Sequence, residues 1–118
     1  MNHRSTGTKY EELAANQMRQ EGYEILEMNY RCKIGEIDIV AKDGQYLVFG
    51  EVKYRKTSAN GMPQEAVNFH KQKKISATAG YYLMTHHYDD SVSVRFDVIS
   101  ILGEKVEIIK NAFPYCFG

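Results

Sequence analysis

The sequence predicts a single α/β domain, in which a mixed five-stranded β-sheet is covered by one α-helix on each side. A chain of 118 residues with 43% hydrophobic and 25% charged residues has the composition of one globular core. Two segments show helical periodicity, and β-branched and aromatic runs follow each of them. One run is apolar on both sides, which is typical of a central strand covered above and below. The predicted order over residues 1–118 is αβββαββ, with residues 1–6 and 114–118 as loose tails.

The first helix is expected from about residue 7 to Glu21, and Gly22 is a typical residue after a helix C-terminus. Thr8 and Glu11 have the spacing of a capping box, in which the glutamate bonds back to the backbone of the capping residue. On the sequence alone, this cap is the favoured role of Glu11. A first strand follows from Tyr23 to Tyr30.

Residues Gly35–Tyr54 predict a β-hairpin, because Asp43-Gly44 between two apolar runs is a strong turn signal. The expected cross-strand pairs are Ala41–Tyr46, Ile39–Val48 and Ile37–Gly50. In this register Glu36 lies opposite Glu51, and Asp38 lies on the diagonal beside them.

One face of this hairpin is expected to carry Glu36, Asp38 and Glu51 together with Lys53. Carboxylates in a covered sheet repel one another and lose solvation, so they require a counter-charge. One lysine does not balance three acids, whereas a divalent cation does, and hard cations take oxygen ligands. The alternative is that Glu-x-Lys is a chance triplet at a solvated strand end.

Residues 56–61 are polar and predict a loop near this face. A second helix is expected from near Pro63 to about Leu83. Its apolar stripe consists of Val67, Ile75, Thr78, Ala79 and Tyr82. Lys71 falls on that stripe with Lys74 beside it, so the Lys71 ammonium either extends into solvent or meets an anion, which is one of the hairpin acids or a phosphate.

Two strands close the predicted fold, Ser93–Leu102 and Glu104–Lys110. Asp97 lies among apolar residues and is expected to be structural, paired with Arg95 or a neighbouring strand. Aromatic residues then alternate in the tail at Phe113, Tyr115 and Phe117. They either cover one end of the core or dock on a second subunit, which would make a homodimer.

Fifteen basic and fifteen acidic residues give a formal net charge of zero, although basic residues concentrate between Lys53 and Lys74. On charge alone, a solvated helix surface is the favoured explanation of such a segment. The sequence has neither a membrane-length apolar run nor an apolar N-terminal signal region, so a cytoplasmic location without membrane association is expected. Cys32 and Cys116 lie far apart in the sequence, which indicates reduced thiols rather than a zinc or redox motif.

An acid on one strand of a hairpin, followed by Glu-x-Lys on the next, resembles the PD-(D/E)xK nuclease superfamily of restriction endonucleases and archaeal Holliday-junction resolvases. More closely, the chain resembles the small bacterial YraN family of predicted endonucleases. The matching segments run through most of the chain: Gly7-x-x-Tyr10-Glu11-x-x-Ala14, Gly22-Tyr23-x-Ile25-Leu26, Asn29-Tyr30-Arg31, Gly35-Glu36-Ile37-Asp38, Phe49-x-Glu51-Val52-Lys53-x-Arg55, Val67-x-x-x-Lys71, Arg95-Phe96-Asp97-Val98 and Asn111-Ala112-Phe113. Gly50 stands where close relatives carry a branched residue, so a β-bulge is expected there.

This resemblance implies a restriction-endonuclease-like fold and Mg²⁺- or Mn²⁺-dependent hydrolysis of phosphodiester bonds in DNA, with branched or otherwise structured DNA as one candidate substrate. Asp38, Glu51 and the backbone carbonyl of Val52 would bind the metal, and Glu11 would join them directly or through water. Lys53 would orient the attacking water or stabilise charge on the phosphate. The remaining implied residues are three phosphate contacts and one acid behind the metal ligands: Arg55, Lys71, Lys74 and Glu36.

Two other function classes fit the same residues. One is a nucleic-acid-binding module that keeps the nuclease fold and cleaves nothing. The other is a scaffold or interaction protein in which Lys53 and Lys71 pair with the acids as a closed salt-bridge network. Metal binding would distinguish the scaffold from both nucleic-acid classes, and cleavage would distinguish the nuclease from the binding module.

Overall fold

The computed structural model describes residues 4–55 and 67–115, which form two helices and one five-stranded sheet. In chain order the elements are α1 (Arg4–Gln20), β1 (Glu24–Arg31), β2 (Glu36–Asp43), β3 (Tyr46–Arg55), α2 (Phe69–Thr85), β4 (Ser93–Leu102) and β5 (Lys105–Phe113). The strands lie side by side in sequence order, with β3 and β4 parallel and the other neighbours antiparallel. The predicted α/β class, mixed sheet and αβββαββ order are therefore confirmed.

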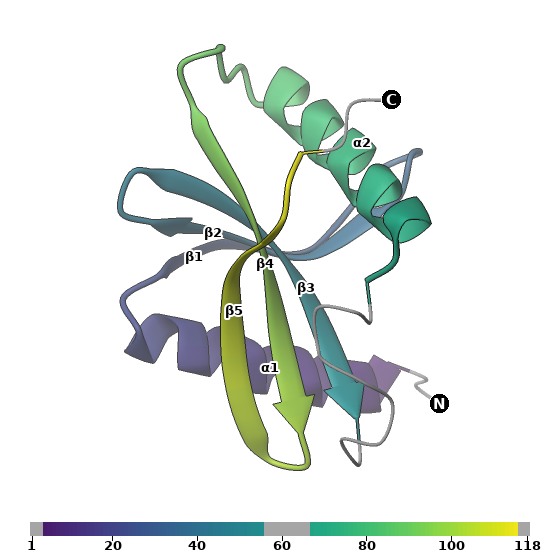
Figure 1. Ribbon diagram of the computed structural model, residues 1–118, viewed down its shortest axis with the longest axis vertical. Coiled ribbons are helices and arrows are strands. Elements are labelled where there is room, and N and C mark those ends of the chain that lie inside the picture. The colour runs from purple at the N-terminus through teal and green to yellow at the C-terminus, as the bar shows by residue number, and fades with distance from the viewer. Residues whose placement is uncertain (1–3, 56–66, 116–118) are drawn as a thin grey trace.

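The two helices lie on opposite faces of the sheet (Figure 1). The layer under α1 includes Ala14, Ala15, Met18, Ile39, Val48 and Ile99. The layer under α2 includes Ile75, Ala79, Tyr82, Val40, Phe49 and Val98. The middle strand β3 contributes to both layers, which is why its sequence is apolar on both sides. Within the described residues, neither helix has the length and apolar character needed to cross a lipid bilayer.

Both helices begin at positions other than those predicted. Helix α1 begins at Arg4, so residues 4–6 are helical, and Thr8 lies inside the helix rather than at its N-cap. The predicted capping box of Thr8 and Glu11 is therefore wrong. Helix α2 begins after Asn68, whose side-chain oxygen accepts a hydrogen bond from the Lys71 N–H at 2.9 Å. Asparagine is a preferred N-cap residue, so this start has a local cause.

The predicted stripe of α2 is buried from Ile75 onward, whereas Val67 is buried but precedes the helix. The predicted helix start near Pro63 is thus too early, and Pro63 itself lies outside the described residues. The loop predicted over residues 56–61 also lies outside them. At the other end, α2 continues two residues beyond Leu83.

The hairpin of β2 and β3 forms with a register two residues away from the predicted one. Asp43 pairs with Tyr46 and Ile39 pairs with Gly50, so the turn consists of Gly44 and Gln45. Gly44 has a φ of +63°, a conformation that glycine adopts without steric cost. Because side chains alternate with a period of two, this shift leaves every residue on its predicted face and changes only which residues lie opposite each other.

The strand β3 passes through Gly50 without a bulge, so the predicted bulge is wrong. The pairing is regular on both sides, with Gly50 next to Ile39 on β2 and next to Asp97 on β4. A Cβ atom at this position would lie 2.9 Å from the Cδ1 atom of Ile99. A side chain at this position would therefore have to displace the end of the Ile99 side chain, which packs over the backbone of β3.

Asp97 is fully buried and structural, as predicted. The Arg95 guanidinium donates to both of its carboxylate oxygens at 2.9 Å, and the Tyr23 hydroxyl donates to it at 2.7 Å. The Asn111 N–H donates to it as well, at 3.0 Å. Arg95 also reaches Asp43 at 2.8 Å. This network joins β4 to β2, β5 and the residue that precedes β1.

The aromatic residues at the C-terminal end cover the core. β5 runs to Phe113, three residues beyond its predicted end at Lys110. The Phe113 ring stacks on Phe96 with a centroid distance of 5.1 Å, and Tyr115 meets the same ring edge-on at 5.5 Å. The first of the two predicted roles therefore holds for Phe113 and Tyr115, whereas Phe117 lies outside the described residues.

Candidate active site

The strands β2 and β3 separate beyond the pair of Ile39 and Gly50. From that point β2 continues to pair with β1 as far as Glu36, whereas β3 continues to pair with β4 as far as Arg55. The two strands therefore form a fork in the sheet. The first residues past the last pair are Asp38 on β2 and Glu51 on β3.

Asp38 fills the opening of this fork. Its Oδ2 atom accepts a hydrogen bond of 2.8 Å from the Val52 N–H, in the place that a backbone carbonyl would occupy in a continued ladder. The N–H and C=O of one residue in an extended strand point to the same side. The Val52 carbonyl therefore faces the same opening, next to the Asp38 carboxylate.

The Glu51 side chain is only 9% exposed and lies between two lysines. Its Oε2 atom is 3.2 Å from the Lys71 ammonium and 3.9 Å from the Lys53 ammonium. Lys53 is on the same strand, whereas Lys71 extends from the first turn of α2. The sequence left the Lys71 ammonium either to extend into solvent or to meet an anion, which is a hairpin acid or a phosphate. In the structure it contacts a hairpin acid, Glu51.

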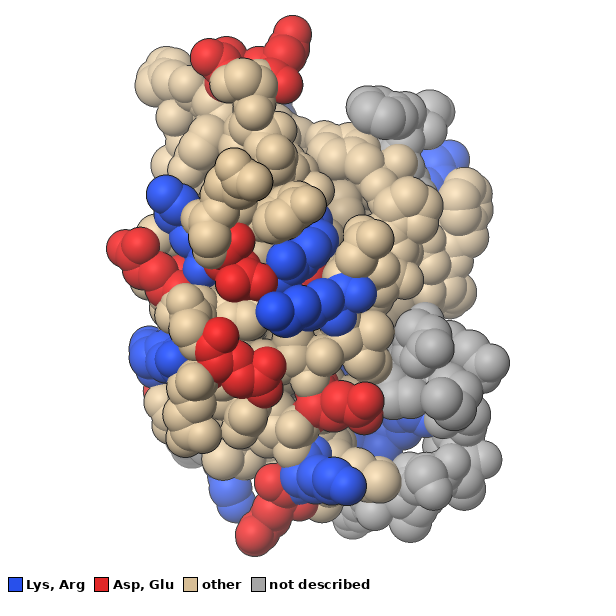
Figure 2. Space-filling model, turned by 60° about the vertical axis from the view of Figure 1, so that its left-hand side comes forward, with Lys and Arg blue, Asp and Glu red and all other residues tan. Residues whose placement is uncertain are grey.

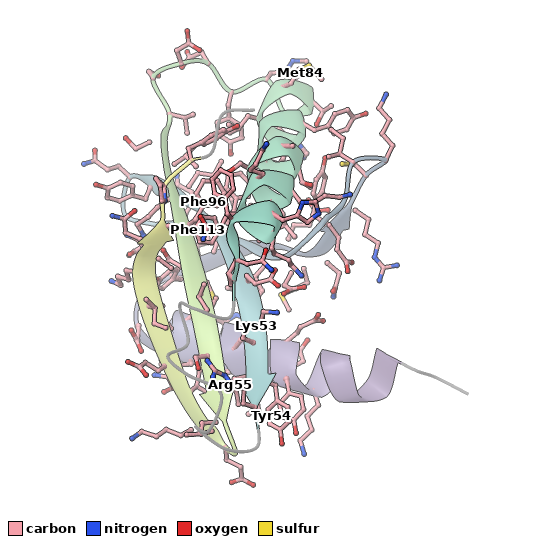
Figure 3. All side chains as sticks on the ribbon, turned by 45° about the vertical axis from the view of Figure 1, so that its right-hand side comes forward. Lys53, Tyr54, Arg55, Met84, Phe96 and Phe113 are labelled. Atoms are coloured by element: carbon pink, nitrogen blue, oxygen red, sulfur yellow. The ribbon has the colours of Figure 1, made fainter. Side chains whose placement is uncertain are left out.

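Figure 3 shows Lys53 on β3 between α2 and α1, with Arg55 at the far end of the strand. The Arg55 carbonyl accepts a hydrogen bond from the Gly103 N–H at 3.1 Å. Lys74 is exposed on α2, and its Cε atom lies 3.5 Å from the position that a Cβ on Gly35 would occupy. Of the predicted phosphate contacts, Lys71 lies beside the acid Glu51, whereas Arg55 lies at the end of β3 and Lys74 lies beside Gly35.

The pKa of Asp38 is raised from 3.8 to about 7. Burial is the largest cause, and the charge of Glu51 is the second. Glu11 and Glu36 raise this pKa further, whereas the hydrogen bond from Val52 favours the ionised form and lowers it. The fork therefore concentrates negative charge in a desolvated place, and an ionised Asp38 requires a positive partner.

The two outer acids differ in position. Glu36 forms an ion pair with Arg31 of β1 at 3.0 Å, and both side chains are more than half exposed. The Glu36 carboxylate is therefore directed to the β1 side and paired there. Glu11 is half-buried on α1, and its charge raises the pKa of Asp38 more than Glu36 does. Glu11 is therefore free of the predicted capping role and acts on the site through its charge.

The donors at the fork suit Mg²⁺ or Mn²⁺. In the described part of the chain, no group of three or more His, Cys, Asp or Glu side chains is close enough together to hold a metal ion. Asp38 and Glu51 supply two carboxylates, and Val52 supplies a carbonyl. Mg²⁺ is commonly bound by one or two carboxylates, with phosphate oxygens and water completing its coordination. The residues present thus match this kind of site rather than an all-protein cage.

One face of the molecule carries charges of both signs. Figure 2 shows Lys and Arg side chains next to Asp and Glu side chains over one face of the molecule, in keeping with fifteen residues of each kind in the sequence. At the fork, Lys53 and Lys71 lie beside Glu51 and are local sources of attraction for a polyanion.

Sequence reasoning missed two contacts at the fork. The hydrogen bond from Val52 to Asp38 depends on where β2 leaves β3, and the pair of Arg31 and Glu36 depends on the register of β1 against β2. No local feature of the sequence indicates where β2 leaves β3 or how β1 pairs with β2. The proximity of Lys71 and Glu51 did have a signal, because both residues are charged positions on faces that are otherwise apolar.

Residues 10–101 match the model of an uncharacterised protein family, UPF0102. A relative in Lachnoclostridium phytofermentans, described as "UPF0102 protein", is 49% identical over 113 residues, which cover 96% of each chain. Relatives with the same description in Syntrophus aciditrophicus and Caldicellulosiruptor bescii are 45% and 43% identical, over 96% of this chain and 91% and 100% of theirs.

Proposed function

The chain belongs to the uncharacterised protein family UPF0102, and we propose that it is a metal-dependent endonuclease that hydrolyses phosphodiester bonds in DNA. The observation that carries this proposal is the fork between β2 and β3. It brings a buried glutamate, an aspartate with a pKa of about 7 and two lysines to one opening in the sheet. Strained electrostatics of this kind are typical of functional sites.

Asp38, Glu51 and the Val52 carbonyl would hold Mg²⁺ or Mn²⁺, and Glu11 would add negative charge directly or through water. When bound, such an ion supplies Lewis-acid polarisation of a phosphate oxygen and lowers the pKa of water. The hydrogen bond from Val52 fixes one oxygen of Asp38, so the carboxylate is oriented in advance. Such preorganisation reduces the cost of assembling a charged site.

Lys53 would stabilise the charge that builds on the reacting phosphate. Its ammonium lies 3.9 Å from Glu51 and is held at the fork by its place two residues farther along β3. Arg55 and Lys74 would contact flanking phosphates, which contribute affinity with little sequence information. DNA with branches or other irregular structure is one candidate substrate, and the zero net charge of the chain provides no general attraction for regular duplex DNA.

A scaffold function is the second candidate, and one observation favours it. Glu51 is already neutralised by Lys71 and Lys53, so part of the site is a closed ion-pair network. Lys53 and Lys71 do not, however, remove the crowding that raises the pKa of Asp38. This crowding of negative charge destabilises the folded protein and is of no use to a scaffold. A metal site would use it, because the crowded carboxylates attract a cation.

The experiment is incubation of the purified protein with Mg²⁺ or Mn²⁺ and a panel of junction, flap, duplex and single-stranded DNA, with RNA counterparts. Asp38→Asn is the matched inactive control, since it keeps the size of the side chain and an acceptor for the Val52 N–H. Metal-dependent cleavage by the wild type alone supports the proposal. Binding without cleavage favours the non-catalytic module, and neither metal binding nor cleavage favours the scaffold.

A further inference from the structure

The first turn of α2 has an unfavourable charge. Lys71 lies in this turn, with its N–H bonded to the N-cap residue Asn68, and Lys73 and Lys74 follow after Gln72. The first turn of α2 contains no acidic residue. Because the N-terminus of a helix carries partial positive charge, cations are disfavoured there and anions are favoured. A nearby anion would therefore offset the unfavourable position of Lys71.

That anion is Glu51 of β3. The Lys71 ammonium is 3.2 Å from the Glu51 Oε2 atom, closer than Lys53 at 3.9 Å. The Glu51 side chain is 9% exposed, whereas the Lys71 side chain is 48% exposed. The acid is therefore fixed in the sheet, while the lysine is long, half in solvent and able to move at low cost.

We propose that Lys71 and a divalent cation are alternative counter-charges for Glu51. This inference rests on the proposed function, because it concerns the same acids. A divalent cation and an ammonium group within a few ångströms of each other repel strongly in a desolvated place. Binding of a cation at Glu51 therefore weakens the ion pair between Glu51 and Lys71. The released ammonium, at the positive end of α2, then faces a phosphate group of the nucleic acid, so that metal binding and phosphate binding are linked.

Titration calorimetry of Mn²⁺ into the protein tests the competition without any cleavage. The variants are Lys71→Met and, as a control with the same change in net charge, Lys73→Met. Lys73 is exposed on the same helix, with its ammonium 5.7 Å from the centre of the Phe69 ring. We expect Lys71→Met to bind Mn²⁺ roughly fivefold more tightly than the wild type, and Lys73→Met to bind it with wild-type affinity.

An affinity of Lys71→Met that is unchanged or weaker overturns the inference. If Mn²⁺ binds the wild type and Lys71→Met equally, only the inference fails and the proposed metal site stands. If Mn²⁺ binds none of the three proteins, the inference and the metal site fail together. A binding titration of a DNA oligonucleotide in Ca²⁺ tests the second half, and we expect Lys71→Met to bind it more weakly than the wild type does. Equal affinities would overturn the link to phosphate.

Discussion

The carboxylate of Asp38 accepts a hydrogen bond of 2.8 Å from the backbone N–H of Val52. This contact closes the point where β2 leaves β3, and it replaces a rung of the ladder with an acidic side chain. Asp38 is buried next to other acids, so its ionised form destabilises the folded protein. Such a cost is expected at a functional site, and it gives the first prediction.

Asp38→Asn should stabilise the protein at pH 8 in buffer that contains EDTA. The pKa of Asp38 is raised from 3.8 to about 7, so between these values the folded protein keeps a proton that the unfolded chain has lost. The free energy of unfolding of the wild type therefore falls as the pH rises through this range, and the asparagine variant lacks this fall.

We expect the Asp38→Asn variant to be more stable than the wild type by roughly 4 kcal/mol at pH 8, with little difference at pH 4. Urea unfolding of both proteins at the two pH values measures this change. The same stability difference at both pH values would show that ionisation of Asp38 is not the cause.

Glu11→Gln should reduce the stabilisation of the protein by Mn²⁺ while changing the melting temperature in EDTA by little. Glu11 is not the helix cap that the sequence suggested, and its charge acts on Asp38 across the site. Melting curves with and without Mn²⁺ measure the effect, and Glu12→Gln is the control because Glu12 is exposed on the same helix. An equal Mn²⁺ response in the two variants would remove Glu11 from the site.

Gly50→Ala should destabilise the protein by about 1–3 kcal/mol, because the added methyl group meets the Cδ1 atom of Ile99 at 2.9 Å. Ile99→Val removes that atom. The double variant should therefore lose less stability than the sum of the two single variants, as measured by a double-mutant cycle of urea unfolding. Additive losses would mean that Gly50 is required for another reason.

Asp97→Asn should destabilise the protein by roughly 3 kcal/mol, because it leaves the Arg95 guanidinium, which is only 10% exposed, without its bidentate partner. Asp89→Asn is the control, since Asp89 is exposed and its side chain accepts hydrogen bonds from its near neighbour in sequence, Ser91. Thermal unfolding of both variants measures the difference. A similar small loss in both would contradict a structural role for the Arg95 network.

Much of the fold was predictable because strand faces follow a period of two. Asp38 and Glu51 are predicted to share one face of the hairpin, and an error of two residues in register does not alter this. The same error did alter the predicted site, since it placed Glu36 opposite Glu51, whereas in the structure Asp38 and Glu51 are the first residues past the last pair of β2 and β3. Turn length sets the register, and the sequence around Gly44 allows more than one length.

The fork itself was not predictable from local signals. Its position depends on β2 following β1 while β3 follows β4, which is a property of the whole sheet. Helix starts failed for a simpler reason, because Thr8 and Pro63 are good start signals that compete with others nearby. The N-cap Asn68 was an equally good signal that lay closer to the true start of α2.

The proposed nuclease activity is tested most directly by single-turnover cleavage of the best substrate in the DNA panel, with enzyme in excess and Mg²⁺ present. Lys53→Ala should lower the cleavage rate by about 100-fold or more, with little loss of DNA affinity, because its charge acts on the transition state. Asp38→Asn should abolish cleavage. A wild-type protein that leaves every substrate intact, or a Lys53→Ala variant that cuts at the wild-type rate, would contradict the assignment of this fork as a nuclease active site.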